Sequence, residues 1–284
     1  MTAVEHPSGK HRGSENFPVG SWLIAKALRP HVHAFYRFAR TADDIADAAE
    51  LPAEEKLRRL DRMAAVLDGA PGDDAPAAAA MRASLRDTGL SAVHCHDLLT
   101  AFRQDATTPR TADWGALMAY CRLSAAPVGR YLLDLHGESR DGWPASDALC
   151  AALQVINHLQ DCADDLRQMN RVYVPLDWLA AEGLGVDALR APRAEPPLRR
   201  VLDRMIEATA PLVASAQTLP ACLRDRGLRS EAAVIAALAA RLLDQLARRD
   251  PLAERVKLGP WGIVAATAGG LLRGLSAGGG RRHA

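Results

Sequence analysis

Apolar residues recur at three- and four-residue steps along most of the chain, which is the spacing of one face of an α-helix. Val32, Phe35, Tyr36, Ala39 and Ala42 follow this spacing. Few segments alternate with period two, and no unit of 20–50 residues repeats, which argues against strands and against a solenoid. The pattern predicts roughly ten to twelve helices in one domain. We expect them over residues 17–29, 31–49, 52–67, 77–87, 91–103, 112–136 with a break at 124–129, 143–169, 198–217, 228–248 and 260–275, with short helical pieces between 170 and 200.

Composition supports an all-α globular protein. Hydrophobic residues make up 49% of the 284 residues, charged residues 24% and aromatic residues 5%, and a mixture of Ala and Leu with Arg, Asp and Glu favours helices. We expect the polar residues 1–15 to form a flexible N-terminal segment and residues 277–284 to form a flexible tail. One helical catalytic domain should then occupy residues 16–276.

Charge and cysteine content narrow the function classes. The net charge is +1, and no stretch combines dense Lys and Arg with aromatics, so nucleic acid is not an expected partner. The five cysteines are scattered and odd in number, which fits reduced thiols. Because the N-terminus lacks an apolar signal core, we expect a cytoplasmic location. The apolar run 259–272 is too short to span a membrane. We interpret 261–272 as core, or alternatively as a surface that docks on the inner membrane.

The first acidic patch comprises Asp43, Asp44 and Asp47. On a helix Asp43 and Asp47 lie one turn apart on the same face, and Arg40 shares that side, while Asp44 lies about 100° away. The alternative interpretation is an ordinary solvated helix face.

The second acidic patch comprises Asn157, Asp161, Asp164 and Asp165, and Gln154 lies three residues before it. Asn157, Asp161 and Asp165 follow four-residue steps within a frame of apolar residues, which suits a buried helix. Carboxylates stacked in this way repel one another, and partial burial adds to the cost. A cation would neutralise them, and oxygen ligands without His or Cys at ligand spacing favour Mg²⁺. Two such patches predict metal-bridged binding of a diphosphate.

The sequence resembles the squalene/phytoene synthase family, which are all-α enzymes of the trans-isoprenyl diphosphate synthase type. The resemblance extends over about residues 14–275, and within the family the branch of bacterial hydroxysqualene synthases is most similar. The segments that carry it are Asp43-Asp44-Ile45-Ala46-Asp47 and Asp161-Cys162-Ala163-Asp164-Asp165, which resemble the two DxxxD motifs of the family, together with residues 14–21 (SENFPVGS), 31–40, 120–130 and 171–175.

The resemblance implies an isoprenoid-synthase-like bundle around a central apolar cavity and a set of residue roles. Mg²⁺, or Mn²⁺ in its place, would be held by Asp43, Asp47, Asn157, Asp161 and Asp165. The catalytic set would be these four aspartates with Tyr36 and Tyr120. Substrate-binding residues would be Ser21, Arg40, Asp44, Gln154, Asn157, Arg171 and Tyr173. The interval from Asp165 to Arg171 is one residue longer than in phytoene-type members, so Arg171 departs from the pattern.

The implied reaction is the Mg²⁺-dependent conversion of presqualene diphosphate and water to hydroxysqualene and diphosphate, within bacterial squalene and hopanoid biosynthesis. The chain would act with a separate presqualene diphosphate synthase. No NADPH is expected, and the sequence has no GxGxxG fingerprint. Two alternatives stay open. One is a family member that condenses two prenyl diphosphates to presqualene diphosphate, squalene or phytoene, and the other is a non-catalytic helical paralogue.

Overall fold

The computed structural model describes residues 4, 24–259, 263–264 and 267–270. The predictions for residues 1–15, for most of the helices over 17–29 and 260–275, and for the tail 277–284 fall outside these residues, as does Ser21. Within the described residues the structure is helical, and its β-structure is an isolated bridge between Arg110 and Val172. The expected all-α fold is therefore confirmed.

Most of the described helices lie within two residues of the predicted ranges. Two predictions were wrong: residues 24–28, the described end of the helix expected over 17–29, are not helical, and the helix expected over 91–103 continues to Thr107. The described helices are α1 (Arg29–Asp47), α2 (Ala53–Leu67), α3 (Pro76–Thr88), α4 (Val93–Thr107), α5 (Trp114–Ser124), α6 (Ala126–Leu135), α7 (Trp143–Met169), α8 (Leu176–Ala181), α9 (Pro196–Ala216), α10 (Leu219–Cys222) and α11 (Arg226–Arg248), with short 3₁₀ helices at Arg140–Gly142 and Val186–Arg190. The helix α10 was not predicted, because its four residues are too few for a periodic pattern.

Local sequence sets the ends of the helices that position the site. A proline lies in the first turn of α1, α6 and α7, where the missing N–H costs nothing. The helix α7 ends at Asn170, whose φ of 53° is left-handed. The predicted break at 124–129 separates α5 from α6 at Ala125. These ends place both acidic patches near the C-terminal ends of α1 and α7.

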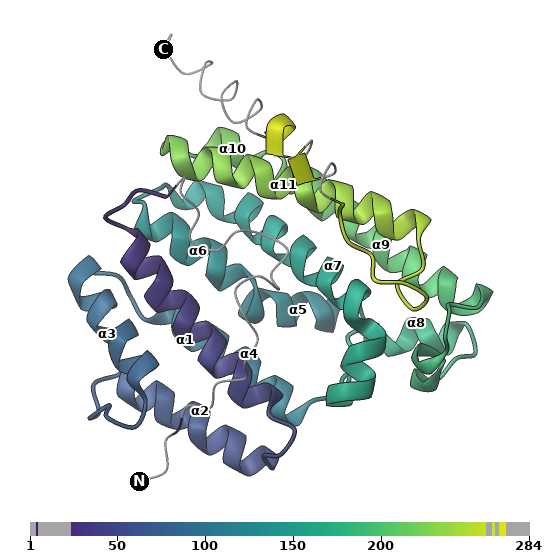
Figure 1. The fold of residues 1–284 in the computed structure, drawn as a ribbon, viewed down its shortest axis with the longest axis horizontal. Helices are drawn as coiled ribbons and strands as arrows, with labels where there is room; N and C mark the ends of the chain where they lie inside the picture. Colours follow the sequence, from purple (N-terminus) through teal and green to yellow (C-terminus); the bar gives the residue numbers. More distant parts are fainter. Residues whose placement is uncertain (1–3, 5–23, 260–262, 265–266, 271–284) are drawn as a thin grey trace.

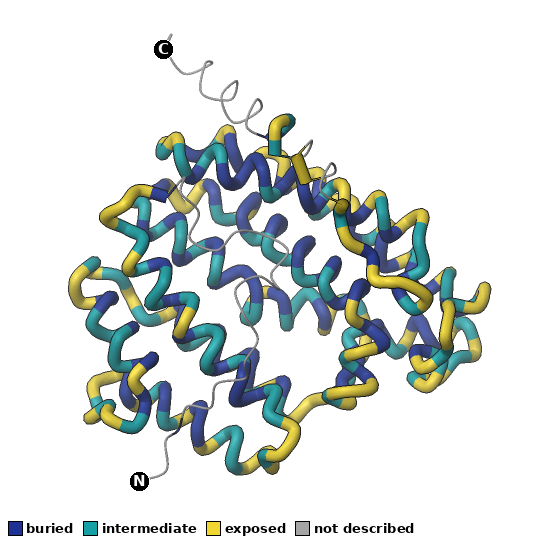
Figure 2. The backbone as a smooth tube through the Cα atoms, viewed as in Figure 1, coloured by how far each residue is buried: buried dark blue, intermediate teal, exposed yellow. Residues whose placement is uncertain are grey.

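The helices pack in layers around α7. Figure 1 shows α6 and α7 between α1–α4 on one side and α9–α11 on the other. One apolar cluster joins α7 to α9 and α11, and a second joins α1 to α2, α3 and α4. The buried residues lie on the sides of these helices that face other helices (Figure 2). Two separate cores therefore leave room for a site between α1 and α7.

Among the described residues, no helix is both long enough and apolar enough to cross a bilayer. All five cysteines are free thiols, as expected.

Candidate active site

A cavity of about 290 Å³ lies between the two cores. Its walls are mostly apolar side chains from α1, α4, α6, α7, α10 and α11, among them Phe35, Leu132 and Leu153. Polar groups from both acid-bearing helices line the same space. Five of the predicted site residues line this cavity: Tyr36, Arg40 and Asp43 from α1, and Gln154 and Asn157 from α7.

The first acidic patch is organised around Arg40. Its guanidinium lies 3.0 Å from Asp43 Oδ2 and 3.1 Å from Asp44 Oδ1. Asp44 is buried beneath this arginine and is not among the residues that line the cavity. Burial, the neighbouring Asp47 and other carboxylates raise the pKa of Asp43 to about 8, although Arg40 opposes the shift. Asp43 therefore lacks enough positive charge nearby to hold it ionised at neutral pH.

The second acidic patch follows one stripe of α7. Gln154 and Asn157 line the cavity, while Asp161 and Asp165 continue the stripe toward the end of the helix. Asp161 is an exposed residue, yet partial desolvation of its carboxyl group, and then the charge of Asp165, raises its pKa. The Asp164 side chain is 61% exposed and pairs with Arg167, whose side chain is 43% exposed. Asp164 thus points away from the stripe.

A buried carboxylate that we had not predicted, Asp105 of α4, lies between the two patches. It accepts hydrogen bonds of 2.8 Å from the hydroxyls of Tyr120 and Tyr173. Burial raises the pKa of Asp105, and burial likewise raises the pKa of both tyrosines well above the usual value. Neither Tyr120 nor Tyr173 is among the residues that line the cavity. In this structure, the hydroxyls of both tyrosines donate hydrogen bonds to the Asp105 carboxylate.

The sequence contains a signal for Asp105, although the residue was not predicted. Asp105 lies three and seven residues after Phe102 and Leu98 on α4, and both of these are buried. A carboxylate on the apolar stripe of a helix is costly to bury unless it has partners, so it indicates a designed polar site. His158 of α7 is a second residue that we had not assigned. It is buried, and its Nδ1 lies 3.8 Å from Asp165 Oδ2.

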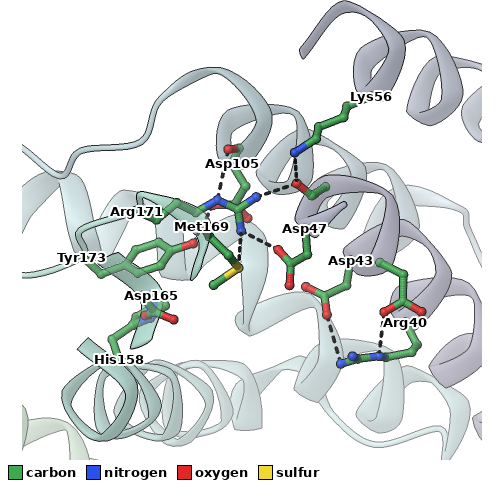
Figure 3. A network of polar contacts seen from close by, with 12 residues as sticks. Arg40, Asp43, Asp47, Lys56, Asp105, His158, Asp165, Met169, Arg171 and Tyr173 are labelled. Carbon is green, nitrogen blue, oxygen red and sulfur yellow. Dashed lines mark hydrogen bonds and ion pairs between the residues drawn. The ribbon is translucent and has the colours of Figure 1, made fainter. Parts of the chain in front are cut away.

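The predicted residue Arg171 is also buried. Its guanidinium donates to Asp47 Oδ1 at 2.5 Å and to the carbonyl of Ala46 at 2.7 Å (Figure 3). The carbonyl of Ala46 also accepts a bond of 2.8 Å from Lys56. Arg171 and Asp47 are not among the residues that line the cavity.

The donor set fits a divalent cation that is shared with a substrate. No group of three or more His, Cys, Asp or Glu side chains in the described part of the chain is gathered closely enough to hold a metal ion. Mg²⁺ is nonetheless usually held by one or two carboxylates together with substrate phosphates and water. Each patch offers oxygen ligands of this kind, and the raised pKa values of Asp43 and Asp161 show carboxylates without full charge compensation. The expected metal ligands stay a prediction.

An all-α bundle around a mostly apolar cavity, with carboxylates and an arginine among its lining residues, is the architecture of the helical isoprenoid synthases. The chain is similar in structure to squalene synthase from Alicyclobacillus acidocaldarius, with a TM-score of 0.72 and 30% identity over 81% of this chain and 87% of that one. A dehydrosqualene synthase has a TM-score of 0.75 at 22% identity over 93% of each chain, which supports the fold alone.

The family model for squalene/phytoene synthase matches residues 10–262, and the chain belongs to this family. It is 47% identical over 270 residues to hydroxysqualene synthase from Rhodopseudomonas palustris, covering 95% of this chain and 92% of that protein. It is 45% identical over 258 residues to hydroxysqualene synthase from Zymomonas mobilis, covering 90% and 86%. The chain is thus an enzyme of a family that acts on prenyl diphosphates, as the resemblance predicted.

Proposed function

We propose that the chain converts presqualene diphosphate and water to hydroxysqualene and diphosphate. The observation that carries this proposal is its 45–47% identity, over nine-tenths or more of the chain, to relatives that bear the name hydroxysqualene synthase. The cavity supports it, because an apolar space bordered by cationic and acidic groups suits a hydrocarbon with a charged head. The reaction exchanges diphosphate for hydroxide at carbon and needs no reductant, so NADPH has no part in it.

The metal ligands in this proposal are the oxygen groups of the two patches. Asp43 and Asp47 would hold Mg²⁺ from α1, and Asn157, Asp161 and Asp165 would hold it from α7; Mn²⁺ could replace it. When bound, the ion would stabilise the negative charge that develops on the departing diphosphate.

The remaining residues bind the substrate and protect the cation that is formed. Arg40, which lines the cavity, would donate to diphosphate oxygens. Tyr36 and Gln154 line the same cavity and would contact the substrate near its reacting carbon. The apolar walls would exclude all but the water that captures the carbocation as the alcohol. The departing diphosphate would accept the proton of that water.

Two partners follow from this chemistry. An enzyme that joins two C15 diphosphates must supply presqualene diphosphate. Substrate and product are both lipids, and Ile263 and Val264 are exposed apolar residues, 47% and 57% accessible. They lie in the segment that we interpreted as core or as a membrane-docking surface, and a transient contact with the inner membrane is part of the proposal.

The test is to incubate the purified protein with Mg²⁺ and either presqualene diphosphate or farnesyl diphosphate, and to identify the products by mass spectrometry. We expect hydroxysqualene from presqualene diphosphate and no turnover of farnesyl diphosphate. Condensation of farnesyl diphosphate alone would support a condensing enzyme instead. If no prenyl diphosphate released diphosphate, the protein would be a non-catalytic paralogue.

A further inference from the structure

The Arg171 side chain joins the two helices that carry the acidic patches. Arg171 follows the end of α7 by two residues, yet its guanidinium contacts the last turn of α1 through Asp47 and the carbonyl of Ala46. Its third donor, Nε, bonds the carbonyl of Asp105 on α4 at 3.2 Å. Arg171 is only 5% exposed. Its N–H donors therefore already have protein acceptors, whereas an arginine that binds a diphosphate directly would direct its donors into the cavity.

Asp105 holds the other end of this connection. Its carboxylate accepts the hydroxyls of Tyr120 and Tyr173. The Tyr173 ring stacks on His158 of α7, with ring centroids 3.6 Å apart, and His158 faces Asp165 of the second patch. A continuous series of contacts thus runs from Asp47 of the first patch to Asp165 of the second (Figure 3).

The chemistry of these groups makes the connection stiff. A buried guanidinium is costly unless carboxylates compensate its charge, and here Asp47 and Asp105 both lie near it. The carbonyl of Ala46 is among the last carbonyls of α1, which have no partner within the helix. Arg171 and Lys56 both donate to this carbonyl. Any movement of α1 away from α7 would leave these buried groups without partners.

We infer that Arg171, held by Asp105, is a positioning residue that fixes the separation of the two acidic patches. This inference rests on the proposed function, because the separation matters only if metal ions and a diphosphate bridge the patches. It assigns Arg171 a role through Asp47 in place of the direct substrate contact that the family resemblance implies. If the connection is lost, we expect each acidic patch to stay intact, while the distance between the two patches changes.

The first measurement uses the metal-free protein. Nitroxide labels introduced through genetically encoded residues at the exposed positions Glu50, after α1, and Gln168, near the end of α7, report the spacing of the patches by pulsed electron resonance. A second pair, Gln168 with Glu207 on α9, reports packing that does not involve the connection. We expect Arg171→Gln to broaden or shift the first distance distribution and to leave the second unchanged.

The matched control is Arg110→Gln. Arg110 donates to the carbonyl and to Oδ1 of Asn170, in the same turn after α7, but is not bonded to α1. It should leave both distributions unchanged. Two milder variants guard against misfolding. Arg171→Lys keeps the charge with fewer donors, and Asp105→Asn keeps an acceptor, so each should show a smaller change of the same sign.

The second measurement is the binding of Mn²⁺ with inorganic diphosphate, followed by steady-state kinetics with presqualene diphosphate. Arg171→Gln should weaken the binding about tenfold and lower kcat on the order of 10²-fold, with KM changed less than about threefold. Arg171→Lys should recover part of both losses. A wholly structural role would lower the melting temperature without this selective loss in kcat.

The two proposals fail in different ways. If Arg171→Gln leaves the Glu50–Gln168 distribution as it is in the wild type, the inference is overturned, whatever the enzyme does. If the distribution changes but the wild type binds no Mn²⁺ and diphosphate, the connection is real and the proposed function is wrong. A distribution that changes equally in the control pair would show general loosening and would also overturn the inference.

Discussion

The proton on Asp43 offers a quantitative test of the site. Burial and the neighbouring Asp47 raise the pKa of this carboxyl to about 8 in the metal-free protein. A raised pKa means that the group is protonated below pH 8 and ionises as the pH rises through 8. Because a carboxyl must lose its proton to bind a metal, metal binding at neutral pH should release that proton.

The size of the effect follows from the pKa. At pH 7 a group with a pKa of about 8 is protonated in about 0.9 of the molecules, and at pH 9 in about 0.1. Binding through Asp43 should therefore release about 0.8 more protons per site at pH 7 than at pH 9. The apparent affinity should rise up to about tenfold per pH unit below pH 8 and level off above it.

Isothermal titration calorimetry provides the assay. Mn²⁺ is titrated into protein with inorganic diphosphate at pH 7, 8 and 9, each in two buffers of different ionisation enthalpy, and the difference in heat counts the protons released. The same titrations with Asp43→Asn subtract the protons that diphosphate and other groups release. Asp97→Asn, which changes an aspartate of α4 that is not among the cavity-lining residues, should behave as the wild type does.

The result that would refute this reasoning is specific. If proton release by the wild type equals that of Asp43→Asn at pH 7, or does not fall between pH 7 and 9, Asp43 is not the protonated ligand that its burial predicts. Proton release that falls in parallel in the wild type and in the variant would assign the effect to diphosphate.

Three further predictions concern single side chains. Asp161→Asn should lower the rate with presqualene diphosphate on the order of 10²-fold, because one stabilising group is lost. The control Asp97→Asn should leave the rate nearly unchanged. If the two variants had the same rate, Asp161 would not belong to the site. In Gly129→Ala the new Cβ would lie 2.3 Å from a Ser146 oxygen, which should cost about 1–3 kcal/mol in thermal unfolding. Gly185→Ala is the control, because its new Cβ would have no atom within 4 Å apart from those of its neighbours in the chain. If the two variants had the same melting temperature, crowding at Gly129 would be contradicted. Asp225→Ala should cost about 1 kcal/mol in urea unfolding, because Asp225 caps α11 by accepting from Leu228 N–H, and an unchanged midpoint would show that this cap is unimportant.

The helices could be predicted because their causes are local. Apolar spacing and the prolines at first turns are properties of adjacent residues, and they predicted α2 and α7 to within one residue and α1 to within two residues at each end. The pairing of Arg40 with Asp43 was predictable for the same reason, because three-residue spacing on one helix brings side chains together. Short elements such as α10 lack enough residues to show a period.

The partners of the site residues depended on contacts between distant segments. Asp47 and Arg171 are 124 residues apart, and Tyr173 and Asp105 are 68 apart. No spacing rule along the chain relates such residues, because packing of α1, α4 and α7 alone brings them together. The family resemblance implied that Tyr120, Tyr173 and Arg171 lie near the site, but neither it nor the spacing of residues revealed their contacts with Asp105.

The amino-acid sequence by itself determined the helical class, most helix boundaries to within two residues and the two oxygen-rich stripes, because each depends on residues within a few turns of one another. Tertiary structure decided which stripe members line the cavity, which are covered by an arginine, and which pKa values rise. Those properties depend on burial and on the charges of groups brought together across the fold, and burial exists only once the helices have packed.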